Sequence, residues 1–182
     1  MVTEDDVTLV KASLNGHTEA FGELVCRYQK AIYNTAFRMV NDYDEAQEIA
    51  QTAFVRAFEK LDTFNPKYRF FSWLYRITMN EAINHIHRFE NQVSIDSGVT
   101  SPEKSPEEVY ERAELYRQVQ SAICQLNIDY RVVIVLKHFT DLTLGELAWV
   151  LEIPVKTVKS RLYTARQQLA GIMRKKGISN DK

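Results

Sequence analysis

The stretch "LTLGELAWVLEIPVKTVKSRLYTARQQL", residues 142–169, has the spacing of a helix-turn-helix. Leu144, Leu147, Ala148 and Leu151 recur every three or four residues, which predicts a first helix with one apolar face. The segment 152–154 predicts a short break, because its proline cannot continue a helix. A second helix follows, and six of its residues share one apolar arc at about 100° per residue. These six residues are Val155, Val158, Leu162, Ala165, Leu169 and Ile172.

The opposite face of this second helix is polar and basic. Residues 154–176 include seven bases and no acid, although the whole chain has 24 acids against 23 bases. Short polar groups and bases on such a helix suit the major groove of DNA, where some read base edges and others bind phosphates. The alternative, a solvated helix with lysines for solubility, is disfavoured because the acid-free surface is long. The candidate DNA-reading residues are Lys156, Thr157, Lys159, Ser160, Arg161, Tyr163, Thr164 and Arg166.

The rest of the chain also has apolar residues at helical spacing, which predicts an all-α fold. Helices are expected over about 21–39, 46–61 and 70–89, and the segment 41–44 is expected to form a turn or cap between the first two. The run 131–139 fits a buried strand or a buried helix, and the lack of hairpin signals favours a helix. Residues 90–106 are polar and have no helical stripe, which predicts a flexible linker between two small helical domains, 1–89 and 107–182.

The stretch "RFFSWLYRITMN", residues 69–80, places four aromatic rings within six positions. A helical wheel assigns Phe71, Leu74 and Tyr75 to the core side. A second stripe contains Trp73, Arg76, Asn80, Asn84 and His87, with Phe70 at the border. Such a stripe suits unpaired bases, since stacking is worth roughly 1–3 kcal/mol per base, and the loop 64–68 just before it suits a pocket for a flipped base. The alternative is that Trp73 packs against a neighbouring helix, and the wheel favours neither.

Composition excludes several other classes of protein. The longest apolar run is far too short to span a membrane, and the acidic start "MVTEDDV" is unlike a signal peptide, so a cytoplasmic protein is expected. Two distant cysteines and four histidines form no metal-binding or catalytic pattern, so no catalytic residue, metal or cofactor is expected. The segment 42–51 has four acids and no base, which is either a solvated face or a surface for a basic partner.

Three stretches together resemble the bacterial RNA polymerase sigma factors of the extracytoplasmic-function (ECF) type. They are "DYDEAQEIAQTAFVRAFEKLDTF" (42–64), "FFSWLYRITMNEAI" (70–83) and the helix-turn-helix of 142–169. The resemblance covers about residues 20–88 and 110–170. It implies two domains without catalytic activity: region 2 (1–89), and region 4 (107–182).

The resemblance also implies a role for each surface. Region 2 would recognise and open the promoter −10 element, and region 4 would read the −35 element and contact the flap of the second-largest polymerase subunit. An anti-sigma factor would hold the protein inactive. The residues implied for −10 recognition are Lys67, Tyr68, Phe70, Trp73, Arg76, Asn80, Asn84, His87 and Arg88. Those implied for binding the clamp helices of the largest polymerase subunit are Asp44, Glu48, Gln51, Thr52 and Val55.

Four residues depart from the family's usual pattern. Thr52 stands where glutamate is usual, and Asn84 and His87 stand where aspartate and arginine are frequent. Glu152 replaces a common glycine, so a positive φ there would be strained. A different class of function, a stand-alone helix-turn-helix regulator that binds duplex DNA as a dimer, would leave the acidic helix and the aromatic stripe without a purpose.

Overall fold

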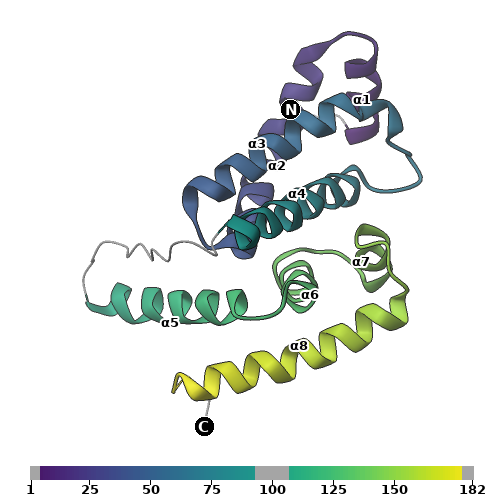
Figure 1. The fold of residues 1–182 in the computed structure, drawn as a ribbon. Coiled ribbons are helices and arrows are strands. Elements are labelled where there is room, and N and C mark those ends of the chain that lie inside the picture. Colours follow the sequence, from purple (N-terminus) through teal and green to yellow (C-terminus); the bar gives the residue numbers. More distant parts are fainter. Residues whose placement is uncertain (1–4, 93–106, 178–182) are drawn as a thin grey trace.

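The computed structural model describes residues 5–92 and 107–177, and within them every regular element is helical. The predicted all-α fold is therefore confirmed. An N-terminal bundle contains α1 (Asp6–Leu14), α2 (Thr18–Val40), α3 (Tyr43–Glu59), the 3-10 turn η1 (Leu61–Thr63) and α4 (Phe70–Gln92). A C-terminal bundle contains α5 (Glu107–Cys124), α6 (Ile128–Phe139), α7 (Leu144–Val150) and α8 (Val155–Lys175). The two bundles lie one above the other in Figure 1.

Local signals in the sequence explain where these helices begin and end. Asn41 ends α2 in the left-handed conformation, with φ of 60°, which asparagine tolerates better than most residues. The Asp42 carboxylate then accepts hydrogen bonds from the backbone N–H groups of Asp44 (2.9 Å) and Glu45 (3.0 Å), so it caps α3. The turn predicted at 41–44 is thus built by two adjacent polar residues.

The core of the N-terminal bundle depends on small residues in α3. Ala46, Ala53 and Ala57 are fully buried, and α3 packs against both α2 and α4. Alanine at these positions lets the helix axes approach, while Leu24 and Ile32 of α2 fill the remaining space. The helical stripe read from the sequence is therefore the packed face of α3.

The C-terminal bundle resolves the ambiguous apolar run in favour of a helix. Residues 132–136 are buried on all sides of α6, because α7 and α8 pack around it. Helices α7 and α8 follow with a four-residue break, which confirms the helix-turn-helix prediction. One detail of the predicted apolar arc is wrong: Val155, the first residue of α8, is 40% exposed, since it lies at the open end of the helix.

The two bundles are in direct contact, which the sequence did not predict. Helix α2 packs against α5 and α6, and α4 packs against α7. Arg131 of α6 donates hydrogen bonds to the carbonyl oxygens of Met39 (2.7 Å) in α2 and of Leu126 (3.3 Å) and Cys124 in its own bundle. Arg38 of α2 bonds to Gln120 at 3.0 Å. The C-terminal carbonyls of α2 are therefore satisfied partly by groups from the other bundle.

The connection between the bundles is only partly described. Helix α4 continues to Gln92, three residues beyond its expected end, and the remainder of the predicted linker, 93–106, lies outside the described residues. Over the described ranges, no helix combines the length and the apolar character that crossing a bilayer requires.

Candidate nucleic-acid and protein interfaces

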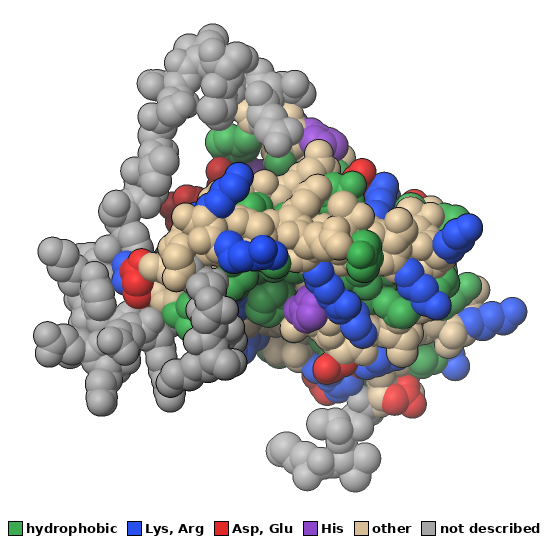
Figure 2. Space-filling view, turned by 90° about the horizontal axis from the view of Figure 1, so that it is seen from below, with side chains coloured by type: hydrophobic (Ala, Val, Ile, Leu, Met, Phe, Trp, Pro, Cys, Tyr) green, Lys and Arg blue, Asp and Glu red, His purple; other side chains and the backbone are tan. Residues whose placement is uncertain are grey.

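Helix α8 carries the eight residues predicted to read duplex DNA. Val158, Leu162 and Ala165 anchor it in the core, which turns the opposite face outward. Lys156, Lys159, Ser160, Tyr163 and Arg166 are exposed, while Thr157, Arg161 and Thr164 are half-buried. Arg161 forms an ion pair with Asp129 at 3.1 Å, so its charge is partly balanced. Figure 2 views the molecule from the side of α8 and shows lysine and arginine side chains spread over this face.

A capping box holds the start of α7, the first helix of the helix-turn-helix. The Thr143 side chain accepts a hydrogen bond from the backbone N–H of Glu146 (3.2 Å), and the Glu146 carboxylate accepts one from the Thr143 N–H (2.8 Å). Burial raises the pKa of Glu146, but these bonds and those from Ser72 outweigh it, so the pKa lies below its usual value. At the other end of α7, Glu152 has φ of 54°, which confirms that a non-glycine residue occupies a strained turn.

The aromatic stripe predicted on α4 is wrong for its two rings. Trp73 is 7% exposed and Phe70 is 2% exposed. Phe64, from the loop that follows η1, packs edge-on against both rings, with centroids 5.7 Å and 5.6 Å away. The wheel left open whether Trp73 packs or binds bases, because a wheel for one helix does not show that the loop folds back over this side of α4. Phe71, which the wheel placed in the core, is only half-buried and stacks on Tyr28.

The polar members of the stripe do reach solvent. Asn80, Asn84, His87 and Arg88 are exposed along α4. A hollow of about 260 Å³ lies between α3 and α4, lined by Asn80 and Asn84 and by two bases that the sequence analysis missed. These bases are Arg56 and Lys60, which lie some 20 positions earlier in the chain, so only the fold brings them there.

A second hollow, of about 350 Å³, lies at the loop before α4. It is lined by residues 66–71, with Asp6 and Tyr28 on its other side. Lys67 and Tyr68, which belong to the set predicted for −10 recognition, are exposed here. Arg69, which that set omitted, is exposed between them and α4. The hydroxyl of Tyr28 donates to Asp6 at 2.5 Å, and burial together with this carboxylate raises the pKa of Tyr28 to about 12.

Helix α3 presents the residues predicted to bind a protein partner. Asp44, Glu48, Gln51 and Val55 are exposed and Thr52 is half-buried, and their spacing places all five along one side of the helix. A groove of about 790 Å³ runs beside them between α2 and α3. Its lining includes Gln51, Val55 and the apolar side chains of Val25, Tyr33 and Phe54. This surface combines acidic and apolar groups and suits a partner with the complementary chemistry.

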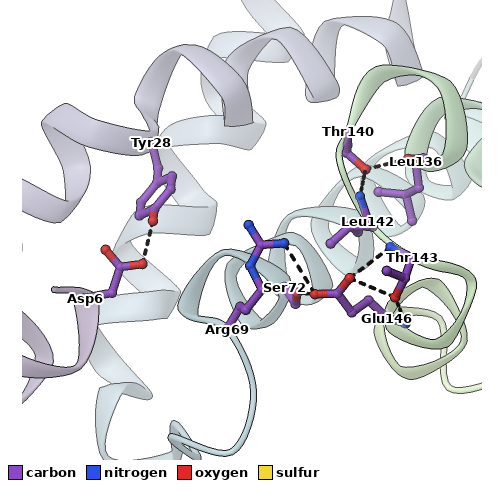
Figure 3. A network of polar contacts seen from close by, with 9 residues as sticks. All are labelled: Asp6, Tyr28, Arg69, Ser72, Leu136, Thr140, Leu142, Thr143 and Glu146. Carbon is purple, nitrogen blue, oxygen red and sulfur yellow. Dashed lines mark hydrogen bonds and ion pairs between the residues drawn. The ribbon is translucent and has the colours of Figure 1, made fainter.

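Helix α7 covers part of the surface at the start of α4. Figure 3 shows Arg69 and Ser72 pointing toward the Glu146 carboxylate, which Thr143 also holds. The Ser72 hydroxyl donates to Glu146 at 3.0 Å, and Arg69 lies 3.6 Å from the same oxygen. Farther along, the Tyr68 ring stacks on Trp149, with centroids 4.4 Å apart and planes at 22°. Arg76 forms an ion pair with Glu152 and lies over the Trp149 ring at 5.2 Å.

Comparison with known proteins identifies the family. Residues 24–90 match the model of Sigma-70 region 2, and residues 116–169 match that of Sigma-70 region 4. The chain is 35% identical to the ECF RNA polymerase sigma factor SigW of Bacillus subtilis, over 88% of this chain and 92% of SigW. This chain belongs to the ECF sigma factors. It is also 35% identical to the RNA polymerase sigma-H factor of Pseudomonas aeruginosa, covering 93% of this chain and 94% of that protein.

Solved structures agree with this assignment. The ECF sigma factor described here superimposes on CnrH, in its complex with the cytosolic domain of CnrY, with a TM-score of 0.73 and 29% identity, covering 94% of this chain and 99% of CnrH. RpoE of Bartonella quintana has the same fold, with a TM-score of 0.68 at 20% identity over 89% of this chain and 98% of that chain. As a sigma factor, the protein binds core RNA polymerase and directs it to promoters. A stand-alone helix-turn-helix regulator is the less favoured interpretation.

Proposed function

We propose that this ECF sigma factor uses three separate surfaces for −35 recognition, −10 opening and polymerase binding. The observation that carries the proposal is a division of charge. Helix α8 exposes Lys156, Lys159 and Arg166 with no acid among its residues, whereas α3 exposes Asp44 and Glu48 at its start. The basic helix suits a polyanion, and the acidic helix suits a basic protein surface.

Region 4, residues 107–182, would read the −35 element through α8. Ser160 and Lys156 lie in the first half of this helix, which is the half that enters the major groove in helix-turn-helix proteins. Lys159 and Arg166 flank them and would bind phosphates, which fixes the register of the helix on the duplex. Arg161 would have to leave Asp129 before it could bind DNA fully.

Region 2, residues 1–89, would bind the −10 element through the loop 66–69 and the exposed side of α4. Tyr68 is 42% exposed and offers the ring on which an unpaired base could stack. Arg76, Asn80 and Asn84 follow it along α4. Because Trp73 and Phe70 are buried beneath this surface, their proposed part is to hold the loop and α4 in position.

The acidic side of α3 and the groove beside it would bind the clamp helices of the largest polymerase subunit, and region 4 would contact the flap of the second-largest. We also propose a protein of the anti-sigma type as a regulator, supported by the cytosolic domain of CnrY bound to the similar protein CnrH. The protein would act in the cytoplasm beside the polymerase and without catalytic activity of its own.

Run-off transcription with purified core RNA polymerase tests this proposal. The wild-type chain and three variants would be mixed with core enzyme and promoter fragments, and co-elution and transcript yield would be measured. Glu48→Lys should abolish co-elution with core enzyme, since it reverses a charge in the surface of α3 that is proposed to bind the polymerase. Lys156→Ala should weaken initiation only on promoters that depend on the −35 element. Tyr68→Ala should leave co-elution intact and reduce open-complex formation.

A matched control and a contradictory outcome complete the test. Glu19→Lys makes the same charge change as Glu48→Lys at an exposed position of α2 outside the three surfaces, and should co-elute normally. Tight duplex binding by the chain alone, together with no initiation when core enzyme is present, would contradict the proposal.

A further inference from the structure

The contact between α7 and the start of α4 joins two surfaces of opposite character. Region 2 contributes Tyr68, Arg69, Ser72 and Arg76, which are an aromatic ring, two guanidinium groups and a hydroxyl. Region 4 contributes the residues that we call the acidic edge of α7: Glu146 and Trp149 in the helix, and Glu152 in the turn that follows it. Each carboxylate of this edge binds an arginine, and its ring stacks on Tyr68. Each of these four region 2 side chains therefore contacts a residue of region 4.

The acidic edge has the chemistry of a nucleic-acid strand. The Trp149 ring stacks on Tyr68 as an unpaired base would. The two carboxylates bind arginines as the phosphates on either side of that base would. The Arg76 guanidinium lies over the Trp149 ring while it pairs with Glu152, so one arginine serves both the ring and the anion. A single strand that entered this surface would need these same four region 2 side chains.

We propose that the acidic edge of α7 is an intramolecular mimic of single-stranded DNA that occupies the −10 surface until a strand displaces it. This inference rests on the proposed function, because it needs the loop 66–69 and α4 to be the strand-binding surface. Region 4 thus serves both as the −35 reader and as a competitor for the −10 site.

Two further observations support this competition. Glu152 occupies a left-handed turn that favours glycine, and the glutamate held there places its carboxylate on Arg76. The two promoter elements are separated by roughly 25 base pairs, on the order of 80 Å of duplex at about 3.4 Å per base pair. In this arrangement, however, a residue of the −10 surface touches the first helix of the −35 reader. We call the arrangement with α7 packed on α4 the closed form. The closed form cannot bind both promoter elements at once, so promoter binding must separate α7 from α4.

The closed form should be easy to displace. Glu152 is 61% exposed, and Arg76 and Glu146 are themselves in contact with solvent. Ion pairs with this exposure are weak and are screened by salt. Because the closing contacts are weak, a sizeable fraction of the molecules should be open. The apparent affinity for a strand equals the affinity of the open form multiplied by that fraction, so closure should lower it only moderately.

The test uses the full chain and a fluorescein-labelled single-stranded oligonucleotide of about 20 nucleotides, with binding followed by anisotropy at low salt. Glu152→Lys places a like charge opposite Arg76 and should raise the affinity for the strand about threefold to tenfold. Glu59→Lys makes the same charge change at an exposed position of α3 outside the contact, and measures the general gain from added positive charge. Only the gain beyond that of Glu59→Lys supports the proposal.

A second measurement follows closure directly. The separation of the two regions is measured by energy transfer between two dyes. One dye is attached to Cys26 of α2, and the other to a cysteine introduced in α8 by Ala170→Cys. Cys124→Ala removes the remaining thiol. Adding the single strand to the wild-type pair should lower the transfer, and adding a duplex of equal length should lower it less. Glu152→Lys should start from a lower transfer.

Two results would overturn the proposal. In the first, Glu152→Lys opens the molecule but binds the strand no better than Glu59→Lys. In the second, neither the wild type nor any variant binds the strand. If Tyr68→Ala and Arg76→Ala also leave run-off transcription unchanged, the proposed −10 surface fails as well. If they impair transcription while the strand-binding result is negative, only the mimicry fails.

Discussion

Replacing Trp73 with alanine is expected to destabilise region 2 rather than to impair DNA contact directly. Trp73 is 7% exposed, and its ring packs against Phe64 at 5.7 Å and Phe70 at 5.6 Å between centroids. A buried aromatic side chain removes about 150–250 Å² from water, and each square ångström is worth roughly 25 cal/mol. These values give about 4–6 kcal/mol before the compactness of the unfolded chain is considered.

The expected loss is somewhat smaller than that upper figure. Unfolded chains already bury part of their apolar surface, which reduces such sums by roughly 10–40%. Truncation of a buried tryptophan to alanine typically costs about 3–5 kcal/mol, including the cavity that remains. We therefore expect Trp73→Ala to lower the free energy of unfolding of region 2 by about 3–5 kcal/mol, and Trp73→Phe by less.

Urea denaturation followed by circular dichroism measures this loss. Tyr68→Ala is the matched control, because it removes an aromatic ring that is 42% exposed and only five positions away. It should cost region 2 less than about 1 kcal/mol while it reduces open-complex formation. A loss below about 1 kcal/mol for Trp73→Ala, with the polymerase co-elution and the fold intact, would refute the assignment of Trp73 to the core.

Three further predictions concern pH, backbone strain and helix capping. Burial raises the pKa of Tyr75 to about 12, so the folded protein keeps the phenol proton between pH 10 and 12 after the unfolded chain has lost it. Stability should fall through that window by about 2–3 kcal/mol more than in Tyr75→Phe, as alkaline urea titrations would measure. Glu152→Gly should be more stable than Glu152→Ala by about 1 kcal/mol, because only alanine retains the strain at φ of 54°. Thr143→Ala should cost region 4 about 1 kcal/mol in thermal unfolding, and Thr143→Ser should retain most of the cap.

Each of these predictions has an outcome that contradicts it. Parallel pH profiles for the wild type and Tyr75→Phe would mean that the phenol titrates normally. Equal stability of the two Glu152 variants would mean that the turn relaxes to another conformation when the side chain is lost. An unchanged melting temperature for Thr143→Ala would show that the start of α7 does not depend on the Thr143 hydroxyl and that the Glu146 carboxylate suffices to hold it.

The parts of the molecule that the sequence predicted well depend on neighbours close in the chain. The helix-turn-helix follows from apolar residues three or four apart and from Pro154, and the α2–α3 turn follows from Asn41 and Asp42. The strain at Glu152 was expected from the family resemblance, because glycine is common at this position of the turn. In each case the deciding interactions lie within one or two helical turns.

The predictions that failed or were missed depend on distant segments. Trp73 is buried because Phe64 folds back over it, and a wheel drawn for one helix contains no information about that loop. Arg56 and Lys60 join Asn80 only because α3 packs against α4. The packing of α7 on α4 joins residues more than 70 positions apart, and no local pattern in either segment indicates it.

Arg131 has a consequence for how the contact between the two regions tolerates mutation. Its guanidinium donates to backbone carbonyls: Met39 in region 2, and Cys124 and Leu126 in region 4. Because every residue supplies a carbonyl, no side-chain substitution at Met39 removes the acceptor. This link is encoded on one side only, so pairwise covariation between the two regions would miss it. Region 2 can change its side chains at this contact without loss of the hydrogen bond, whereas region 4 must keep its arginine.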